Sequence, residues 1–298
     1  MESVRAGAVV NDDTLTLLTA ALLAGGHALL EDVPGVGKTL LAKALARALG
    51  GSFKRVQCTP DLLPSDITGG AIYNQRESKF EFVPGPLFSN IVLVDEINRA
   101  SPRTQSSLLE SMAEGQVTTD GITHRLERPF FLMATQNPIE MAGTFPLPEA
   151  QLDRFLVMLS LGYPAFTDEV EILAREEHGD PLASVTSPLT LDDVVALQAA
   201  VLKVHVARLL KEYIVHLLHD TRAHPEAALG VSPRGGAALQ RCAQALALIA
   251  GRDFVTPDDI KRAALAALPH RILARDRQPE TARIVVQDAL SRVPVPVE

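Results

Sequence analysis

A turn containing two glycines, followed by Lys and Thr, joins the apolar segment 27–31 to a helix-forming segment. The turn and the first helical residues read Pro34-Gly35-Val36-Gly37-Lys38-Thr39-Leu40. Gly35 and Gly37 let successive backbone N–H groups curl around an anion, and the helix adds the positive end of its dipole. Lys38 can then reach the β- and γ-phosphates of a nucleotide, and the Thr39 hydroxyl can ligate Mg²⁺. These residues predict a nucleotide phosphate-binding loop.

An ordinary strand-to-helix turn in which Gly-Lys-Thr occurs by chance is the alternative interpretation. Asp32 also stands where the general motif has glycine. The context favours the loop, because 27–31 is a short apolar strand candidate and 41–49 places its apolar side chains on one helical face.

Two adjacent carboxylates, Asp95 and Glu96, follow the unbroken apolar run 91–94. Such a run is typical of a parallel strand buried on both faces, and ligands bind at the carboxyl ends of such strands. Asp95 can belong to the Mg²⁺ shell, and Glu96 can orient and polarise an attacking water. Together with Lys38 and Thr39 they form a minimal set for phosphoryl transfer to water. A helix N-cap after the strand is the structural alternative for this pair.

Three further polar residues are candidates for the same chemistry. Asn137 closes the neighbouring strand candidate 130–135, and its amide could contact the water or the γ-phosphate, although Asn-Pro is also a common turn. Arg154 precedes another strand candidate, so it has either a salt-bridge partner or a phosphate role. Arg234 starts a helix after Ser232, where the dipole disfavours a cation, which suggests a nearby anion unless Arg234 is simply a surface residue. The scattered histidines show no metal-ligand spacing.

The remaining pattern predicts an α/β core with a parallel sheet, followed by a helical domain. Strands are predicted over 27–31, 53–58, 91–94, 130–135 and 155–161, with inserted hairpins over 69–86 and around Asp120-Gly121. Helices are predicted over 12–23, 40–49, 104–114, 147–153, 207–221, 233–250 and 257–267. Pro181 and Pro188 within residues 166–189 predict a linker there. The expected division is therefore a core at 1–165 and a helical domain at 190–298.

Composition narrows the classes of protein that fit this pattern. The 298 residues are 47% hydrophobic and 21% charged, with no apolar run as long as a bilayer span and no secretory signal. Cys58 and Cys242 lack metal-ligand spacing and fit small buried side chains in a reducing compartment, so we expect a cytoplasmic protein. A net charge of −8 argues against broad nucleic-acid binding.

Several motifs in order resemble the MoxR family of AAA+ ATPases. They are Val33-Pro34-Gly35-Val36-Gly37-Lys38-Thr39, Val94-Asp95-Glu96-Ile97-Asn98-Arg99, Ala134-Thr135-Gln136-Asn137-Pro138, Leu152-Asp153-Arg154-Phe155, Ser232-Pro233-Arg234 and Leu268-Pro269-His270-Arg271. The resemblance covers nearly the whole chain and implies a P-loop NTPase αβα sandwich followed by an all-α lid. It also implies ATP and Mg²⁺ as ligands.

By this resemblance the candidate residues take specific roles. Lys38 and Thr39 belong to the Walker A site, Asp95 and Glu96 to Walker B, and Asn137 to the first sensor. Arg154 is similar to an arginine finger offered to a neighbouring subunit, and Arg234 to the second sensor of the lid. The resemblance further implies a ring, often a hexamer, that acts with a von Willebrand factor A domain partner on a protein substrate.

The function expected from these observations is Mg²⁺-dependent ATP hydrolysis that remodels or matures a partner protein or inserts its metal cofactor. A nucleotide-gated assembly module that hydrolyses ATP slowly is one alternative, although an intact Glu96 favours the enzyme. A DNA-acting relative that uses the hairpin loops is another, and the acidic charge weighs against it.

Overall fold

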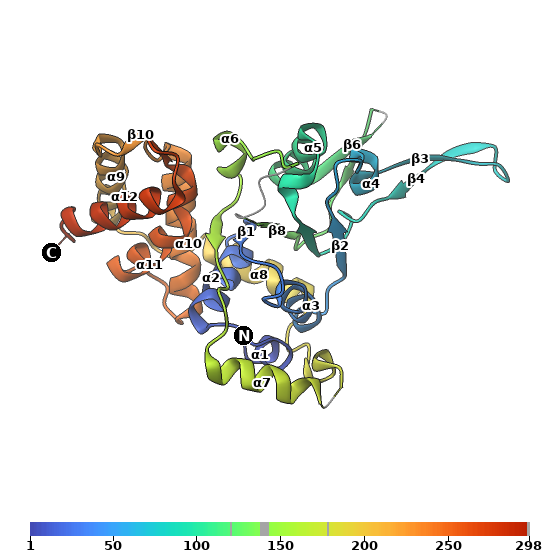
Figure 1. The fold of residues 1–298 in the computed structure, drawn as a ribbon, viewed down its shortest axis with the longest axis horizontal. Coiled ribbons are helices and arrows are strands. Elements are labelled where there is room, and N and C mark those ends of the chain that lie inside the picture. The colour runs from blue at the N-terminus through green and yellow to red at the C-terminus, as the bar shows by residue number, and fades with distance from the viewer. Residues whose placement is uncertain (120, 138–142, 178, 297–298) are drawn as a thin grey trace. The chain divides into compact units, whose positions relative to one another are not determined.

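The computed structural model describes residues 1–119, 121–137, 143–177 and 179–296 (Figure 1). The chain groups into two compact units that interleave in sequence. The first contains Met1–Asn11, Leu29–Leu147 and Ser160–Val195, and the second contains Asp12–Ala28, Pro148–Leu159 and Ala196–Glu298. The domain limits expected from the sequence stay a prediction.

The first unit is built on a parallel sheet whose strands lie in the order β2-β5-β8-β1. Their bounds are β1 (Ala28–Glu31), β2 (Phe53–Gln57), β5 (Ile91–Asp95) and β8 (Phe131–Gln136). β5 is parallel to both β2 and β8, and every residue of β5 is buried. Its aliphatic run therefore forms a central strand covered on both faces, as the sequence predicts. The α/β class is confirmed.

Helix α3 (Lys38–Ala48) follows β1 and packs against β5 and β2. Its buried side chains recur with helical spacing and form the predicted apolar face. Helix α5 (Pro102–Glu114) begins after Ser101, whose hydroxyl caps the amide of Thr104, and ends before Gly115, which has a φ of +63°. These two helices begin and end within two residues of their predicted bounds.

Three helices of the first unit were not expected. They are α1 (Glu2–Gly7), α4 (Pro64–Thr68) between β2 and the first hairpin, and α7 (Phe166–Glu176) within the predicted linker. The linker predicted over 166–189 stays a prediction, and α7 lies within that segment. Its apolar residues Phe166, Val170 and Leu173 have helical spacing, yet all three are exposed, so they mark no face of the core.

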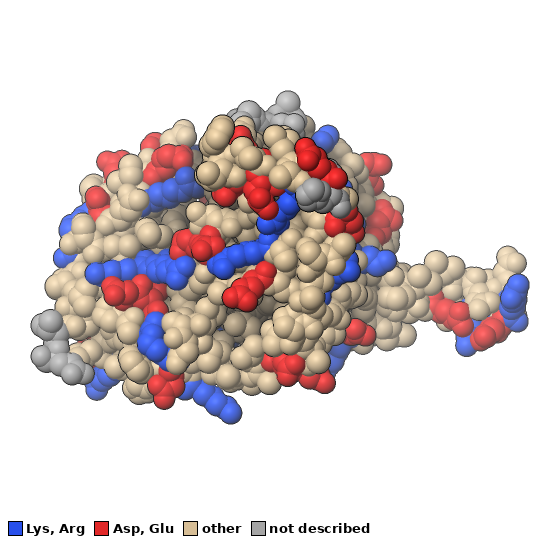
Figure 2. Space-filling view, turned by 90° about the horizontal axis from the view of Figure 1, so that it is seen from below, with Lys and Arg blue, Asp and Glu red and all other residues tan. Residues whose placement is uncertain are grey.

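Two hairpins extend the first unit and confirm the predicted insertions. β3 (Gly69–Asn74) pairs with β4 (Lys79–Pro84), and β6 (Gln116–Thr119) pairs with β7 (Ile122–Arg125), while Asp120 lies outside the described residues. The β3–β4 ribbon projects away from the sheet of its unit (Figure 1). Its charged side chains gather at the tip, and the stem carries few of them (Figure 2).

The second unit is mainly helical. It contains α2 (Asp12–Leu23), α6 (Glu149–Leu152), β9 (Val157–Leu159), α9 (Arg208–Ala223), α10 (Pro233–Ile249), α11 (Pro257–Ala267) and α12 (Pro279–Arg292), while α8 (Leu191–Val201) runs into it from the first unit. α10 packs against α2, α9 and α11 through small buried side chains such as Ala243 and Ala247. Two short strands, β10 (Ala227–Leu229) and β11 (Leu273–Ala274), pair where no strand was expected. Among the described residues, no helix is long and apolar enough to cross a membrane.

Candidate nucleotide site

The loop between β1 and α3 turns at two glycines with positive φ. Gly35 has a φ of +90° and Gly37 a φ of +87°, a region that other residues adopt only with strain. Lys38 begins α3, and its Nζ donates hydrogen bonds to the carbonyl oxygens of Asp32, at 3.0 Å, and Val33, at 3.3 Å. Partial burial lowers the pKa of Lys38, while the negative charges of nearby carboxylates oppose that shift.

Asp32 fixes the base of this loop. Its buried carboxylate accepts hydrogen bonds from the hydroxyl of Ser160, at 2.7 Å, and from the amides of Leu161, at 2.8 Å, and Gly162, at 3.0 Å. The position where the general motif has glycine therefore holds an anchor that ties the loop to the segment after β9. Removing this carboxylate would leave three donors without their acceptor.

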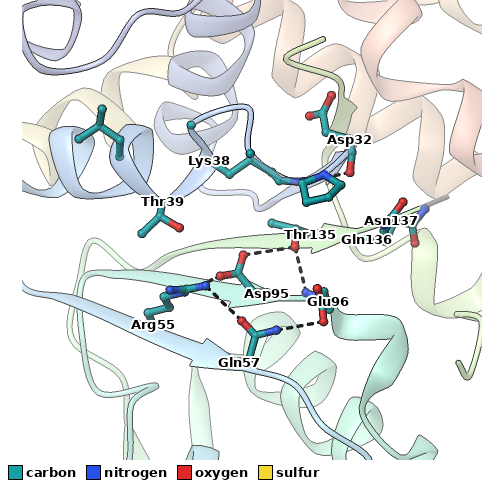
Figure 3. A pocket seen from close by; sticks show the side chains of 14 residues that line it. Asp32, Lys38, Thr39, Arg55, Gln57, Asp95, Glu96, Thr135, Gln136 and Asn137 are labelled. Atoms are coloured by element: carbon teal, nitrogen blue, oxygen red, sulfur yellow. Dashed lines mark hydrogen bonds and ion pairs between the residues drawn. The ribbon is translucent and has the colours of Figure 1, made fainter. Parts of the chain in front are cut away.

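A cavity of about 340 Å³ opens beside the loop (Figure 3). Its lining residues are Asp32, Pro34, Gly35, Gly37, Lys38, Thr39, Leu40, Arg55, Gln57, Asp95, Glu96, Thr135, Gln136 and Asn137. Lys38 and Thr39 come from the loop side, and Asp95 and Glu96 come from the carboxyl end of β5 on the other side. The structure thus brings together nearly all the candidate residues of the first unit. Val36 lies in the same loop, and Pro138 after Asn137 lies outside the described residues.

The two carboxylates have different surroundings. Asp95 is 7% exposed, and its Oδ2 contacts the Nε of Arg55 at 2.5 Å while its Oδ1 accepts from the Thr135 hydroxyl at 3.3 Å. Glu96 has a φ of +56°, which turns its side chain out of the strand direction, and its amide donates to the Thr135 hydroxyl at 2.9 Å. Glu96 Oε2 accepts hydrogen bonds from Gln57 and Arg99, each at 3.0 Å.

Four further residues contact Asp95 or Glu96 and were given no role from the sequence. They are Arg55, Gln57, Arg99 and Thr135. Arg55 and Gln57 are two residues apart on β2, so they lie on one face, and Arg55 also donates to the Gln57 amide oxygen at 3.1 Å. The signal that could have found them is polarity at alternate positions near the carboxyl end of a strand. The local sequence does not show that β2 lies beside β5. It therefore could not connect Arg55 and Gln57 with Asp95 and Glu96.

Arg154 and Arg234 belong to the second unit. Arg154 follows α6 and is half-buried. Arg234 lies at the start of α10, where Ser232 caps the helix, and its Nε is 3.8 Å from Asp153 Oδ2. The predicted anion near Arg234 is therefore present within the chain as Asp153. The Arg234 side chain is 58% exposed and the contact is long, so this ion pair adds little stability.

Asp153 is held more firmly by Arg271. The side chain of Arg271 is 2% exposed, and its Nε donates to Asp153 Oδ1 at 2.7 Å. The same guanidinium donates to the carbonyls of Phe155, at 2.6 Å, and Leu156, at 3.2 Å. Burial lowers the pKa of Arg271, and the charge of Asp153 opposes that shift. Arg271 also donates to the carbonyl of Asp153 at 3.3 Å, so it fixes the backbone on both sides of Arg154.

The donor set of the cavity fits a Mg²⁺ ion bound together with phosphates. Thr39 supplies a hydroxyl oxygen and Asp95 a carboxylate, and hard oxygen ligands of this kind suit Mg²⁺, which usually keeps waters and phosphate oxygens in its shell. Among the described residues, no group of three His, Cys, Asp or Glu side chains is placed to hold a metal by itself.

Two family models match the chain. The model described as "ATPase family associated with various cellular activities (AAA)" matches residues 27–157, and the AAA lid domain model matches residues 219–293. The first match contains the cavity and the second contains α10 and α11.

Relatives along the whole chain decide the family. The chaperone MoxR1 of Mycobacterium tuberculosis is 40% identical over 97% of this chain and 79% of its own length. The protein MoxR of Paracoccus denitrificans is 32% identical over 95% of this chain and 91% of its own. The chain belongs to the MoxR family of AAA+ ATPases.

Two further similarities also extend along nearly the whole chain. The uncharacterized protein YeaC of Bacillus subtilis is 52% identical over 96% of this chain and 90% of its own length. A crystal structure of a candidate ATPase from Cytophaga hutchinsonii superposes with a TM-score of 0.91 and is 38% identical, covering 99% of this chain and 93% of that one. The protein is accordingly a nucleotide-binding ATPase with the AAA+ fold and a lid domain.

Proposed function

We propose that this MoxR-family ATPase hydrolyses ATP with Mg²⁺ in the cavity beside the phosphate loop and uses the turnover to remodel a partner protein. The observation that carries the proposal is the placement of Lys38 and Thr39 across one cavity from Asp95 and Glu96. A cation and a hydroxyl on one side of a polyphosphate, with two carboxylates on the other, are what phosphoryl transfer to water needs.

Each residue has a role in this mechanism. Lys38 exchanges its carbonyl partners for phosphate oxygens, and the loop amides between Pro34 and Leu40 donate to the same anion. Thr39 and Asp95 would hold Mg²⁺, which neutralises charge on the phosphate oxygens when bound. Glu96 orients the attacking water and accepts its proton, and Asn137 holds that water or the γ-phosphate.

The proposal includes assembly into a homo-oligomeric ring, with a hexamer as the expected form. In such a ring Arg154 completes the site of a neighbouring subunit, and Arg234 responds to nucleotide from the lid. The buried bracing of the backbone beside Arg154 by Arg271 supports this role, because an arginine that must meet a partner's phosphate needs a fixed base. A von Willebrand factor A domain protein is the expected partner. The two free buried cysteines fit the cytoplasmic location that we expect.

A protein substrate is supported by the surface of the hairpins. Ile72, Tyr73, Phe80 and Ile122 are each at least half exposed, between 50% and 72%, on β3, β4 and β7. Exposed apolar side chains on such hairpins suit contact with polypeptide. The charges of the β3–β4 hairpin include Lys79 paired with both Glu77 and Glu81, so this ribbon presents no basic track for nucleic acid. The name of the chaperone MoxR1 agrees with a remodelling role.

The test measures ATP turnover and asks whether a hydrolysis-deficient variant retains its protein substrate. Steady-state phosphate release by the purified protein should require Mg²⁺ and be lost in the Glu96→Gln variant, and that variant with ATP should retain the remodelled protein during purification. Turnover indistinguishable from buffer, with nucleotide-dependent assembly intact, would favour the slow assembly module instead. DNA stimulation of phosphate release would favour the DNA-acting alternative.

A further inference from the structure

Arg55 forms an ion pair with Asp95, the carboxylate that is proposed to hold Mg²⁺. Its Nε is 2.5 Å from Asp95 Oδ2, and its side chain lines the same cavity as the phosphate loop. The other oxygen of Asp95 accepts from Thr135, so both oxygens of Asp95 already have partners. Figure 3 shows Arg55 reaching from β2 toward Asp95.

A guanidinium and a metal ion compete for this carboxylate. Asp95 is almost fully buried, so a positive partner compensates for its desolvation when no metal is present. Mg²⁺ demands close and regular oxygen coordination, and a guanidinium nitrogen at 2.5 Å from Oδ2 stands where a ligand shell would form. The Arg55 side chain is 50% exposed, so it can leave without opening the core.

Gln57 defines the position from which Arg55 acts. The Gln57 amide oxygen accepts from Arg55 Nη2 at 3.1 Å, and the Gln57 amide nitrogen donates to Glu96 at 3.0 Å. These contacts hold the guanidinium against Asp95. We propose that Arg55 is a positioning residue that holds Asp95 in the metal-free site and is displaced when Mg²⁺ arrives with the nucleotide. Arg55 thereby sets the Mg²⁺ concentration at which the site loads. This inference rests on the Mg²⁺ site of the proposed function.

The test measures metal affinity directly. Binding of Mn²⁺, used in place of Mg²⁺, is followed by electron paramagnetic resonance with a saturating non-hydrolysable ATP analogue. Arg55→Gln should bind Mn²⁺ about two- to five-fold more tightly, which is the range that a half-exposed ion pair supports. Lys54→Gln is the matched control, because Lys54 makes the same charge change on β2 but faces the other way by strand alternation. We expect its Mn²⁺ affinity to equal that of the wild type.

The Asp95→Asn background separates this inference from the Mg²⁺ site itself. Asp95→Asn should weaken Mn²⁺ binding, and adding Arg55→Gln should then change nothing further, because the competition is lost. If Asp95→Asn weakens Mn²⁺ binding but Arg55→Gln matches Lys54→Gln or binds more weakly, the role of Arg55 is wrong and the metal site stands. If Asp95→Asn leaves Mn²⁺ affinity unchanged, the metal site fails and the inference about Arg55 fails with it.

Discussion

The Lys38 ammonium donates to two neutral acceptors in the loop, the carbonyl oxygens of Asp32 and Val33. These two loop carbonyls partly replace the water that the ammonium loses on burial. A polyphosphate offers a full negative charge in their place, so exchange of partners is favourable, and charge-assisted hydrogen bonds are the stronger kind.

Replacement of Lys38 tests this interpretation. Lys38→Ala removes the one side-chain cation of the loop from a site whose other loop contacts are dipolar, so isothermal titration should detect no binding of ATP. Lys43→Ala, on the exposed side of α3, is the control and should keep the wild-type affinity. Unchanged affinity in Lys38→Ala would show that the nucleotide binds elsewhere.

The proposed role of Glu96 is in hydrolysis and not in ATP binding, so the two can be measured separately. Glu96→Gln preserves the shape of the side chain but removes the charge that polarises water, so ATP affinity should persist while turnover falls by about 100-fold or more. Phosphate release measures turnover, and titration measures affinity. Glu110→Gln on α5 makes the same chemical change at an exposed position and should leave both values unchanged. Turnover near the wild-type rate would remove Glu96 from the mechanism.

Residues whose roles follow from a local motif were predictable, and residues whose roles follow from strand pairing were not. Lys38 follows a glycine turn at the start of a helix and Asp95 ends an apolar strand, so local sequence patterns predicted both residues for one site. Arg55 reached Asp95 only because β2 pairs with β5 with Gln57 beside Asp95 in register. That register is a long-range property of the sheet, which periodicity within β2 cannot supply.

At the scale of elements, α10 presents Arg234 at its positive end. The long contact with Asp153 at an exposed position is worth little, within about 0.2–1 kcal/mol for such pairs. Arg234→Ala should therefore lower the melting temperature of the nucleotide-free protein only slightly. The rise in melting temperature on adding ATP should shrink much more if Arg234 responds to nucleotide. An equal drop with and without ATP would indicate a structural arginine.

The turn that carries Arg271 makes the second unit sensitive to acid. Burial and the neighbouring charge of Arg271 hold the pKa of His270 well below its ordinary value. The folded protein therefore keeps His270 neutral, while the unfolded chain takes up a proton as pH falls below about 6.5. Stability from this group is present above that pH and is lost below it, by up to about 1.4 kcal/mol for each pH unit.

His270→Gln tests this account. Its amide can still donate to the carbonyl of Phe155, which His270 Nε2 contacts at 3.1 Å, but it does not titrate. Denaturant unfolding between pH 7 and 5 should show a smaller loss of stability in the variant than in the wild type. His216→Gln, at an exposed position of α9, should follow the wild type. Equal acid sensitivity in His270→Gln and the wild type would show that another group is responsible.

Elements with a strong local signal were predicted, and those formed by tertiary contacts were missed. β5 and β8 begin with unbroken apolar runs, and the hairpins have polar turns between β-forming residues, so the local pattern identified them. β10 and β11 are two or three residues long and pair across more than forty residues, which leaves no local signature. The apolar residues of α7 have helical spacing but are exposed. The segment that follows α7 contains Pro181 and Pro188, which favoured the interpretation as a linker.

At the scale of the whole molecule, the interleaving of the units matters most. Residues 12–28 and 148–159 belong to the second unit although the first unit surrounds them in sequence. Sequence composition changes once along the chain, near residue 165, so it could indicate a later helical domain but not these exchanged segments. Arg154 lies in such a segment, with its backbone fixed by Arg271. The fixed backbone beside Arg154 is relevant to the proposed ring, in which Arg154 would complete the site of a neighbouring subunit.

Arg154 tests whether active sites are shared between subunits. If Arg154 completes a neighbour's site, Arg154→Ala subunits should bind ATP but hydrolyse it slowly, because charge on the transferring phosphoryl group is left without its stabilising partner. Lys38→Ala subunits lack the phosphate-loop cation but keep Arg154. In a mixed ring some interfaces pair an intact loop with an intact Arg154. Phosphate release by the mixture should therefore exceed that of either variant alone.

Mixing is informative only when subunits exchange, so native mass spectrometry of differently tagged variants is the control. The proportion of complete interfaces is greatest near equal mixing and falls toward either pure variant, so activity plotted against composition should pass through a maximum. Independent subunits would instead give a line between the two low values. If exchange is verified and the plot is that line, Arg154 acts within its own chain, and a local ion pair becomes its better-supported role.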